Sequence, residues 1–152
     1  MRLVLSSRTR RAVPVVMLCG ALALQSLVPQ PASAGPRSTV FRMVNDARRS
    51  HGRRPLHLSA SISALAARHS SRMARSGTLF HSRCLDCIRR RHGWSAIGEN
   101  VGYAGSARTV ERLFMRSPPH RSNLLCRCFR TIGIGIVRGH GRVWVTQLFY
   151  RP

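Results

Sequence analysis

The hydrophobic period of the chain changes from helical to alternating near residue 131, and this change limits the folds open to it. Between residues 40 and 116, apolar residues recur at spacings of three and four, as in amphipathic helices. Residues 132–137 and 142–150 alternate instead and flank a glycine-containing turn, which predicts a β-hairpin. Helices followed by a hairpin predict an α+β fold in which helices pack on an antiparallel sheet.

The helical part divides into segments with recognisable ends. We expect helices at residues 40–51, 59–75 and 109–116, and a further helical turn at 120–125. Ser59 and Gly77 are a suitable N-cap and C-terminal residue for the second helix. His69 lies on the apolar face of that helix and is expected to be a hydrogen-bonded core residue. Residues 77–96 are expected to form a long connection, and Gln147 is expected on the surface of the sheet.

The N-terminus has the organisation of a secretory signal peptide. A positive segment that contains Arg10 and Arg11 precedes an apolar stretch, and Ala32-Ser33-Ala34 fits a signal peptidase site. A retained membrane anchor is the alternative, but the apolar stretch is shorter than the roughly 20 residues of a typical span. We therefore predict a signal peptide at 1–34, a short lead at 35–38 and one domain at 39–152, secreted as a monomer without a transmembrane span.

The charge of the chain is strongly positive, because all 26 basic residues are arginine and only four residues are acidic. Four of the arginines precede residue 35, so the predicted mature chain carries a formal charge of +18. Such a charge favours binding to an anionic cell-envelope polymer or membrane. The alternative is a solvated arginine-rich surface without a specific partner. Specific nucleic-acid binding is not expected, because basic patches with interleaved aromatic residues are absent.

Four cysteines follow the predicted signal peptide, in the clusters Cys84–Cys87 and Cys126–Cys128. An even number of cysteines in a small exported domain predicts disulfides. A zinc site with four thiolates is the alternative. We expect disulfides that pair one cluster with the other, because a bridge within Cys126-Arg-Cys128 would be strained.

The order of four motifs is more specific than any motif alone. They are Gly-Glu-Asn-Val at 98–101, Ser-Pro-Pro-His-Arg-Ser-Asn-Leu-Leu at 117–125, Ile-Gly-Ile-Gly-Ile-Val at 132–137 and Trp-Val-Thr-Gln-Leu-Phe at 144–149. This series resembles the bacterial branch of the CAP superfamily (cysteine-rich secretory proteins, antigen 5 and pathogenesis-related proteins). The resemblance covers residues 40–150 and implies an α-β-α sandwich with a polar cleft.

The resemblance also implies which residues line the cleft. His81 corresponds to the first cleft histidine of the family, Glu99 to the first acid and His120 to the second histidine. The position of the second acid is occupied by Ser117, and Glu111 would substitute only if its helix were rotated. Two asparagines in the motifs, Asn100 and Asn123, are further candidates for the cleft, with loop hydrogen bonding as the alternative role.

Three functions remain open. Two imidazoles and a carboxylate are a plausible zinc site, with His81 and His120 as metal ligands, or else a hydrogen-bonded polar cluster. The missing acid favours non-enzymatic binding of a lipid, an envelope polymer or a host component through the His/Glu cleft. A metal-dependent hydrolase that uses His81, Glu99 and His120 is the first alternative. A cationic envelope-binding or antimicrobial module is the second.

Overall fold

The computed structural model describes residues 35–152, so the predicted signal peptide at 1–34 lies outside the described residues. The elements are α1 (Pro36–Ser50), β1 (His57–Leu58), α2 (Ala60–Ser76), α3 (Leu85–Arg91), β2 (Ala96–Ala104), α4 (Ala107–Arg116), α5 (Pro118–Leu125), β3 (Thr131–Gly139) and β4 (Arg142–Arg151). None of these helices is both long enough and apolar enough to cross a membrane.

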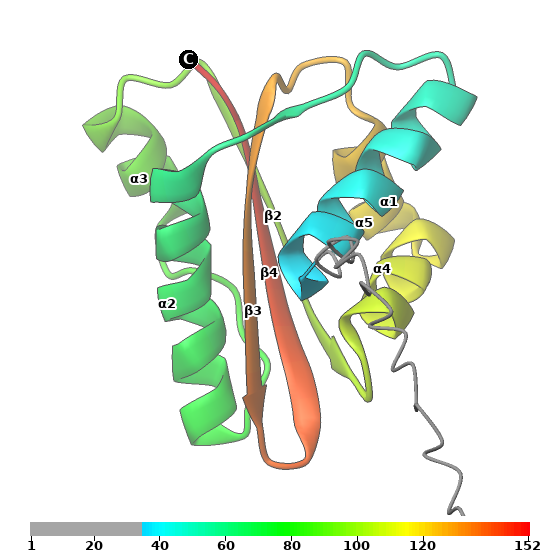
Figure 1. The fold of residues 1–152 in the computed structure, drawn as a ribbon. Coiled ribbons are helices and arrows are strands. Elements are labelled where there is room, and N and C mark those ends of the chain that lie inside the picture. The colour runs from blue at the N-terminus through cyan, green and yellow to red at the C-terminus, as the bar shows by residue number, and fades with distance from the viewer. Residues whose placement is uncertain (1–34) are drawn as a thin grey trace, which may run out of the picture. The chain divides into compact units, whose positions relative to one another are not determined.

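A four-stranded sheet forms the middle layer, in the order β1-β3-β4-β2. Strand β4 pairs antiparallel with both β3 and β2, whereas the two-residue β1 pairs parallel with β3. Helices α2 and α3 cover one face of the sheet, and α1, α4 and α5 cover the other (Figure 1). The α-β-α sandwich implied by the resemblance is therefore confirmed, although β1 makes the sheet mixed.

Helix α2 lies unusually close to β3, because small residues and glycines face each other. The hydroxyl of Ser70 donates to the carbonyl of Gly135 at 3.1 Å, and that of Ser63 accepts from the N–H of Ile134 at 3.1 Å. A Cβ atom at Gly135 would lie 2.2 Å from backbone atoms of Ala66. This close approach holds the helix against the sheet and thereby places His69 beside β2.

Helix α1 is held by two buried polar side chains. The amide of Asn45 exchanges two hydrogen bonds with the backbone of Leu56, at 2.8 and 3.1 Å. The Arg48 guanidinium donates to the carbonyls of Arg54, Leu124 and Cys126 at 2.7–3.0 Å. The helix begins at Pro36, whose fixed φ suits a first helical turn, so residues 36–38 belong to it and are not a separate lead.

Several sequence predictions are confirmed and others are wrong. Ser59 caps α2 and Gly77 ends it with φ at +67°. Helix α3 and strand β2 both fall in segments for which no element was predicted. Gln147 is fully buried and not on the sheet surface, because α4 covers that part of the sheet.

The sequence predicts disulfides between the two cysteine clusters, and this prediction is wrong. Cys84 is bonded to Cys87 and Cys126 to Cys128. The physical reason is the position of the clusters. Cys84 is the N-cap of α3 on one face of the sheet, and Cys126 follows α5 on the other face (Figure 1). A bridge needs Cα atoms within about 7 Å of each other, and the intervening sheet prevents such an approach between the clusters.

Candidate functional site

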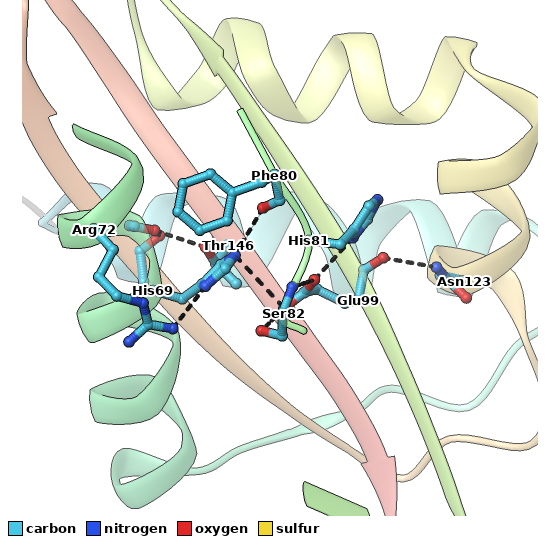
Figure 2. A network of polar contacts seen from close by, with 10 residues as sticks. His69, Arg72, Phe80, His81, Ser82, Glu99, Asn123 and Thr146 are labelled. Carbon is cyan, nitrogen blue, oxygen red and sulfur yellow. Dashed lines mark hydrogen bonds and ion pairs between the residues drawn. The ribbon is translucent and has the colours of Figure 1, made fainter. Parts of the chain in front are cut away.

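A buried carboxylate on β2, that of Glu99, is the centre of a polar cluster (Figure 2). Its Oε1 accepts from Nδ1 of His81 at 2.8 Å and from the backbone N–H of Ser82 at 2.9 Å. Its Oε2 accepts from the Ser82 hydroxyl at 2.6 Å. Since a carboxylate can only accept, the His81 imidazole must carry a proton on Nδ1. The loop before α3 thus stabilises the buried carboxylate of Glu99 with three hydrogen bonds.

His69 belongs to the same cluster, a contact that the sequence did not reveal. It is buried and hydrogen-bonded, as expected of a core histidine, but its Nε2 lies 4.0 Å from Oε2 of Glu99. Arg72 donates to Nδ1 of His69 at 2.9 Å, so Nε2 carries the proton and donates to the Phe80 carbonyl at 2.9 Å. Arg72, one turn further along α2, is the sequence signal that could have revealed a polar role for His69.

The two motif asparagines connect β2 to α5. The Asn123 amide donates to the Glu99 carbonyl at 3.2 Å and to the Asn100 side chain at 2.9 Å. The Asn100 amide in turn donates to the His120 carbonyl at 3.1 Å and to the side chain of Gln147 at 3.1 Å. These bonds fix the position of α5 and therefore the place of the His120 ring.

The His120 imidazole does not contact Glu99. Its Nδ1 lies 2.8 Å from the Ser117 hydroxyl, and its ring packs on Phe114 with 4.8 Å between the centroids. Burial lowers the pKa of His120, and the neighbouring His81 lowers it further. The neutral form of His120 is therefore favoured more than in a free imidazole, and its ring lies beside Phe114, whereas His81 and Glu99 form a separate hydrogen-bonded pair.

Glu111 does not take the place of the missing second acid. It is only 2% exposed, and its Oε2 accepts from the Gln147 amide at 2.5 Å. Its Oε1 is buried and has no hydrogen-bond partner among residues 35–152. Burial raises the pKa of Glu111 to about 7, partly offset by the bond from Gln147. Glu111 is thus connected to the backbone carbonyl of His120 only indirectly, through hydrogen bonds of the Gln147 and Asn100 side chains.

The replacement Glu111→Gln should make the stability of the protein less dependent on pH. The folded pKa of about 7 exceeds the ordinary value of 4.5, so the folded state holds the proton more tightly. The free energy of unfolding of the wild type should therefore fall as the pH rises from about 4.5 to about 7. We expect the free energy of unfolding of Glu111→Gln, relative to that of the wild type, to be about 2–3 kcal/mol higher at pH 8 than at pH 4.

Urea denaturation at both pH values, followed by circular dichroism, measures this gain. An exposed carboxyl provides the control, because Asp46→Asn should leave the difference from the wild type almost constant with pH. Equal pH profiles for Glu111→Gln and the wild type would show that Glu111 is not a source of the pH dependence.

Among residues 35–152, the cleft offers a zinc ion only two ligand atoms that make no hydrogen bond, Nε2 of His81 and Nε2 of His120, which is fewer than the three or four ligands of a protein zinc site. Both oxygens of Glu99 accept hydrogen bonds. Nδ1 of His81 faces Glu99, and Nδ1 of His120 faces Ser117. Among residues 35–152, no three His, Cys, Asp or Glu side chains are grouped closely enough to hold a metal ion. The cysteines are paired in disulfides and do not supply thiolate ligands. The residues as arranged favour the polar-cluster interpretation of the cleft.

An open groove of about 450 Å³ has His120 as part of its lining. It is lined by Leu79, Val101, Gly102, Tyr103, Val110, Leu113, Phe114, Ser117 and His120. Most of this lining is apolar, and Ser117 and His120 supply the polar groups. Arg142 lies over the exposed ring of Tyr103, with its guanidinium carbon 4.5 Å from the centroid. The groove is thus an apolar channel with polar groups at His120 and a cation beside Tyr103.

The sequence matches the cysteine-rich secretory protein family (CAP) over residues 41–149. An extracellular protein with an SCP domain from Bacillus anthracis is 22% identical, with a TM-score of 0.66, over 75% of this chain and 39% of its own length. A cysteine-rich secretory protein from Staphylococcus aureus is 22% identical, with a TM-score of 0.64, over 80% of this chain and 40% of its own.

An outer surface protein of Borrelia burgdorferi is 13% identical, with a TM-score of 0.69, over 80% of this chain and 96% of its own. The chain therefore spans about two fifths of the first two proteins, and its likeness to all three is a likeness of fold. No curated protein matches the sequence significantly.

Proposed function

Because the chain belongs to the cysteine-rich secretory protein (CAP) family, we propose that it is a secreted, non-enzymatic protein that binds a lipid in the groove beside His120. The ligand would have an acyl chain and an anionic head group. Secretion is part of the proposal, and it is supported by the signal-like segment at 1–34 and by the two disulfides.

The position of exposed apolar side chains carries the proposal. Five large hydrophobic residues among those described are exposed by more than a third: Leu58, Leu79, Phe80, Tyr103 and Leu113. Three of these five residues, Leu79, Tyr103 and Leu113, line the groove beside His120. The volume of this groove lies in the size range of small-molecule sites. Apolar side chains gathered in a groove with a polar edge are typical of a binding site for an apolar ligand.

The charge of the domain favours an anionic head group. Residues 35–152 carry 22 arginines and four acids, and two of the acids, Glu99 and Glu111, are buried away from solvent. Arg142 beside Tyr103 and the donors at the His120 end could each contact a carboxylate or phosphate of the ligand. An acyl chain would then lie along Leu113 and Leu79.

The arrangement of the cleft counts against the metal-dependent hydrolase, because His81 bonds to Glu99 whereas His120 bonds to Ser117. It also counts against a serine hydrolase. Ser117 and His120 are within hydrogen-bonding distance, as a nucleophile and base would be. A serine hydrolase also uses a carboxylate to orient its histidine. Glu99 bonds to His81 and Ser82 instead, and no carboxylate within residues 35–152 contacts His120.

Leu113→Asp should weaken lipid binding while a matched replacement outside the groove should not. Leu113 is 48% exposed and lines the groove, whereas Leu58 is 38% exposed and does not. An aspartate at 113 removes apolar contact and repels an anionic ligand. We expect the Kd for a fluorescent long-chain fatty acid to rise at least about tenfold in Leu113→Asp and to change less than about twofold in Leu58→Asp.

Titration of delipidated protein with the fluorescent fatty acid measures these values. Absence of saturable binding to the wild type would refute the proposal. Equal weakening by both variants would place the fatty acid outside this groove.

A further inference from the structure

We propose that five arginines around a second hollow form a binding site for a phosphate-type oxyanion. The hollow has a volume of about 240 Å³ and is lined by Arg48, Gly52, Arg53, Arg54, Arg127 and Arg130. It shares no lining residue with the apolar groove. The proposal is therefore independent of lipid binding. We call these five arginines the arginine pocket.

Two segments that are distant in sequence, residues 48–54 and 127–130, build the arginine pocket, and Arg48 joins them. Arg48 lies in the last turn of α1, and its guanidinium bonds to the carbonyl of Arg54 in the segment after the helix. The same guanidinium bonds to the carbonyls of Leu124 and Cys126, at the end of α5. In addition, Nε of Arg53 donates to the Leu125 carbonyl at 3.0 Å. The backbone that carries the arginines is thus held in place before any anion binds.

The Cys126–Cys128 disulfide contributes to this preorganisation. It closes a small covalent ring around Arg127, whose side chain is exposed at the rim of the pocket. Arg130 follows two residues after the ring and bonds to the carbonyls of Arg127 and Phe129. The short ring restricts the backbone at Arg127, and the two hydrogen bonds restrict where the Arg130 guanidinium can lie, which reduces the entropy lost on binding.

The charges of the arginine pocket are not balanced within the described part of the protein. Within residues 35–152, none of the five arginines forms an ion pair. Asp46 pairs with Arg49 and Asp86 with Arg89 and Arg90, and the remaining acids, Glu99 and Glu111, are buried. Nη2 of Arg48 makes no hydrogen bond to residues 35–152. Burial lowers the pKa of Arg48, and the positive charges of Arg130 and Arg53 lower it further. A bound anion would relieve this repulsion.

The chemistry of the arginine pocket favours a phosphate group as the anion. Planar guanidiniums bind phosphate oxygens in pairs, and a tetrahedral oxyanion offers acceptors in several directions at once. A planar carboxylate offers only two oxygens to five surrounding cations. Because a water molecule takes up about 30 Å³ in the liquid, a volume of 240 Å³ holds one phosphate group with several waters.

Calorimetric titration with inorganic phosphate, at constant ionic strength set with sodium chloride, tests the proposal. Arg127→Gln/Arg130→Gln removes two rim cations and leaves the structural bonds of Arg48 in place. The control Arg68→Gln/Arg75→Gln removes the same charge from α2, on the opposite face of the sheet, where a second arginine-lined hollow lies. We expect the first pair to weaken phosphate binding at least about tenfold and the control to change it less than about twofold.

A second titration, with the diester glycerophosphoglycerol, identifies the source of the phosphate group. Tighter binding of inorganic phosphate would assign the site to a free ion. Equal or tighter binding of the diester would assign it to a phosphate within a lipid head group or polymer, and either result supports an oxyanion site. Unsaturable binding of both probes, or equal weakening by both double variants, would overturn the proposal. Thermal unfolding of each variant without ligand verifies that it is folded.

Discussion

Gly135→Ala is expected to lower the free energy of unfolding by at least about 4 kcal/mol, or to prevent folding altogether. A Cβ atom at this position would lie 2.2 Å from the carbonyl carbon of Ala66 and from the nitrogen of Ala67. Both atoms belong to the backbone of α2, so no side-chain rotation can relieve the overlap. Helix α2 would have to move away from β3, and the hydrogen bond from Ser70 to the Gly135 carbonyl would be lost with it.

Gly105→Ala is the matched control for this experiment. Gly105 is exposed, has no atom within 4 Å of a built Cβ and does not have a positive φ. We expect its replacement to change the free energy of unfolding by less than about 0.5 kcal/mol. Urea denaturation followed by circular dichroism compares the two variants. Similar stabilities would mean that α2 does not need its close approach to β3.

Arg48→Met should lower the free energy of unfolding by about 4 kcal/mol, because it leaves three carbonyls without their donor at about 1–3 kcal/mol each. Methionine retains much of the length and apolar contact of the arginine stem, so the loss should come mainly from the guanidinium. Two of the three bonds join α1 to the end of α5 and to Cys126, which lie more than 70 residues further along the chain. Their loss would loosen the packing of α1.

The neighbouring arginine supplies the control for Arg48→Met. Arg49 is exposed and pairs only with the exposed Asp46. Exposed ion pairs contribute little, so Arg49→Met should change the free energy of unfolding by less than about 1 kcal/mol. Denaturation of both variants under the same conditions measures the difference. A loss of similar size in both variants would show that net charge, and not the three carbonyl contacts, determines the effect.

Local signals in the sequence were sufficient for the elements that follow simple rules. Ser59 and Gly77 mark the ends of α2, and the alternation around Ile134 and Val145 marks the final hairpin. Strand β2 lacks that alternation, because Gly98 and Gly102 interrupt it. Those glycines are required by tertiary contacts, since a Cβ at either position would overlap Phe129 or Phe114. The strand could therefore not be recognised from its own residues.

The candidate site was only partly predictable, for a similar reason. The resemblance selected His81, Glu99 and His120, and the structure joins the first two but turns His120 toward Ser117. His69 and Ser82 reach Glu99 through the packing of α2 and of the loop before α3, which no local pattern encodes. The disulfide pairing likewise depended on which face of the sheet each cysteine cluster occupies.

The order of the strands also has a consequence for the time at which the fold can form. Strand β4 is the last described element in chain order, yet it lies between β3 and β2, which do not pair with each other. Strand β2 therefore has no partner in the sheet until residues 142–151 are available. Pairing between distant segments is slow to form. In a chain emerging from its N-terminus, β2 would thus stay unpaired until β4 appears, so the centre of the sheet would be the last part of the fold to form.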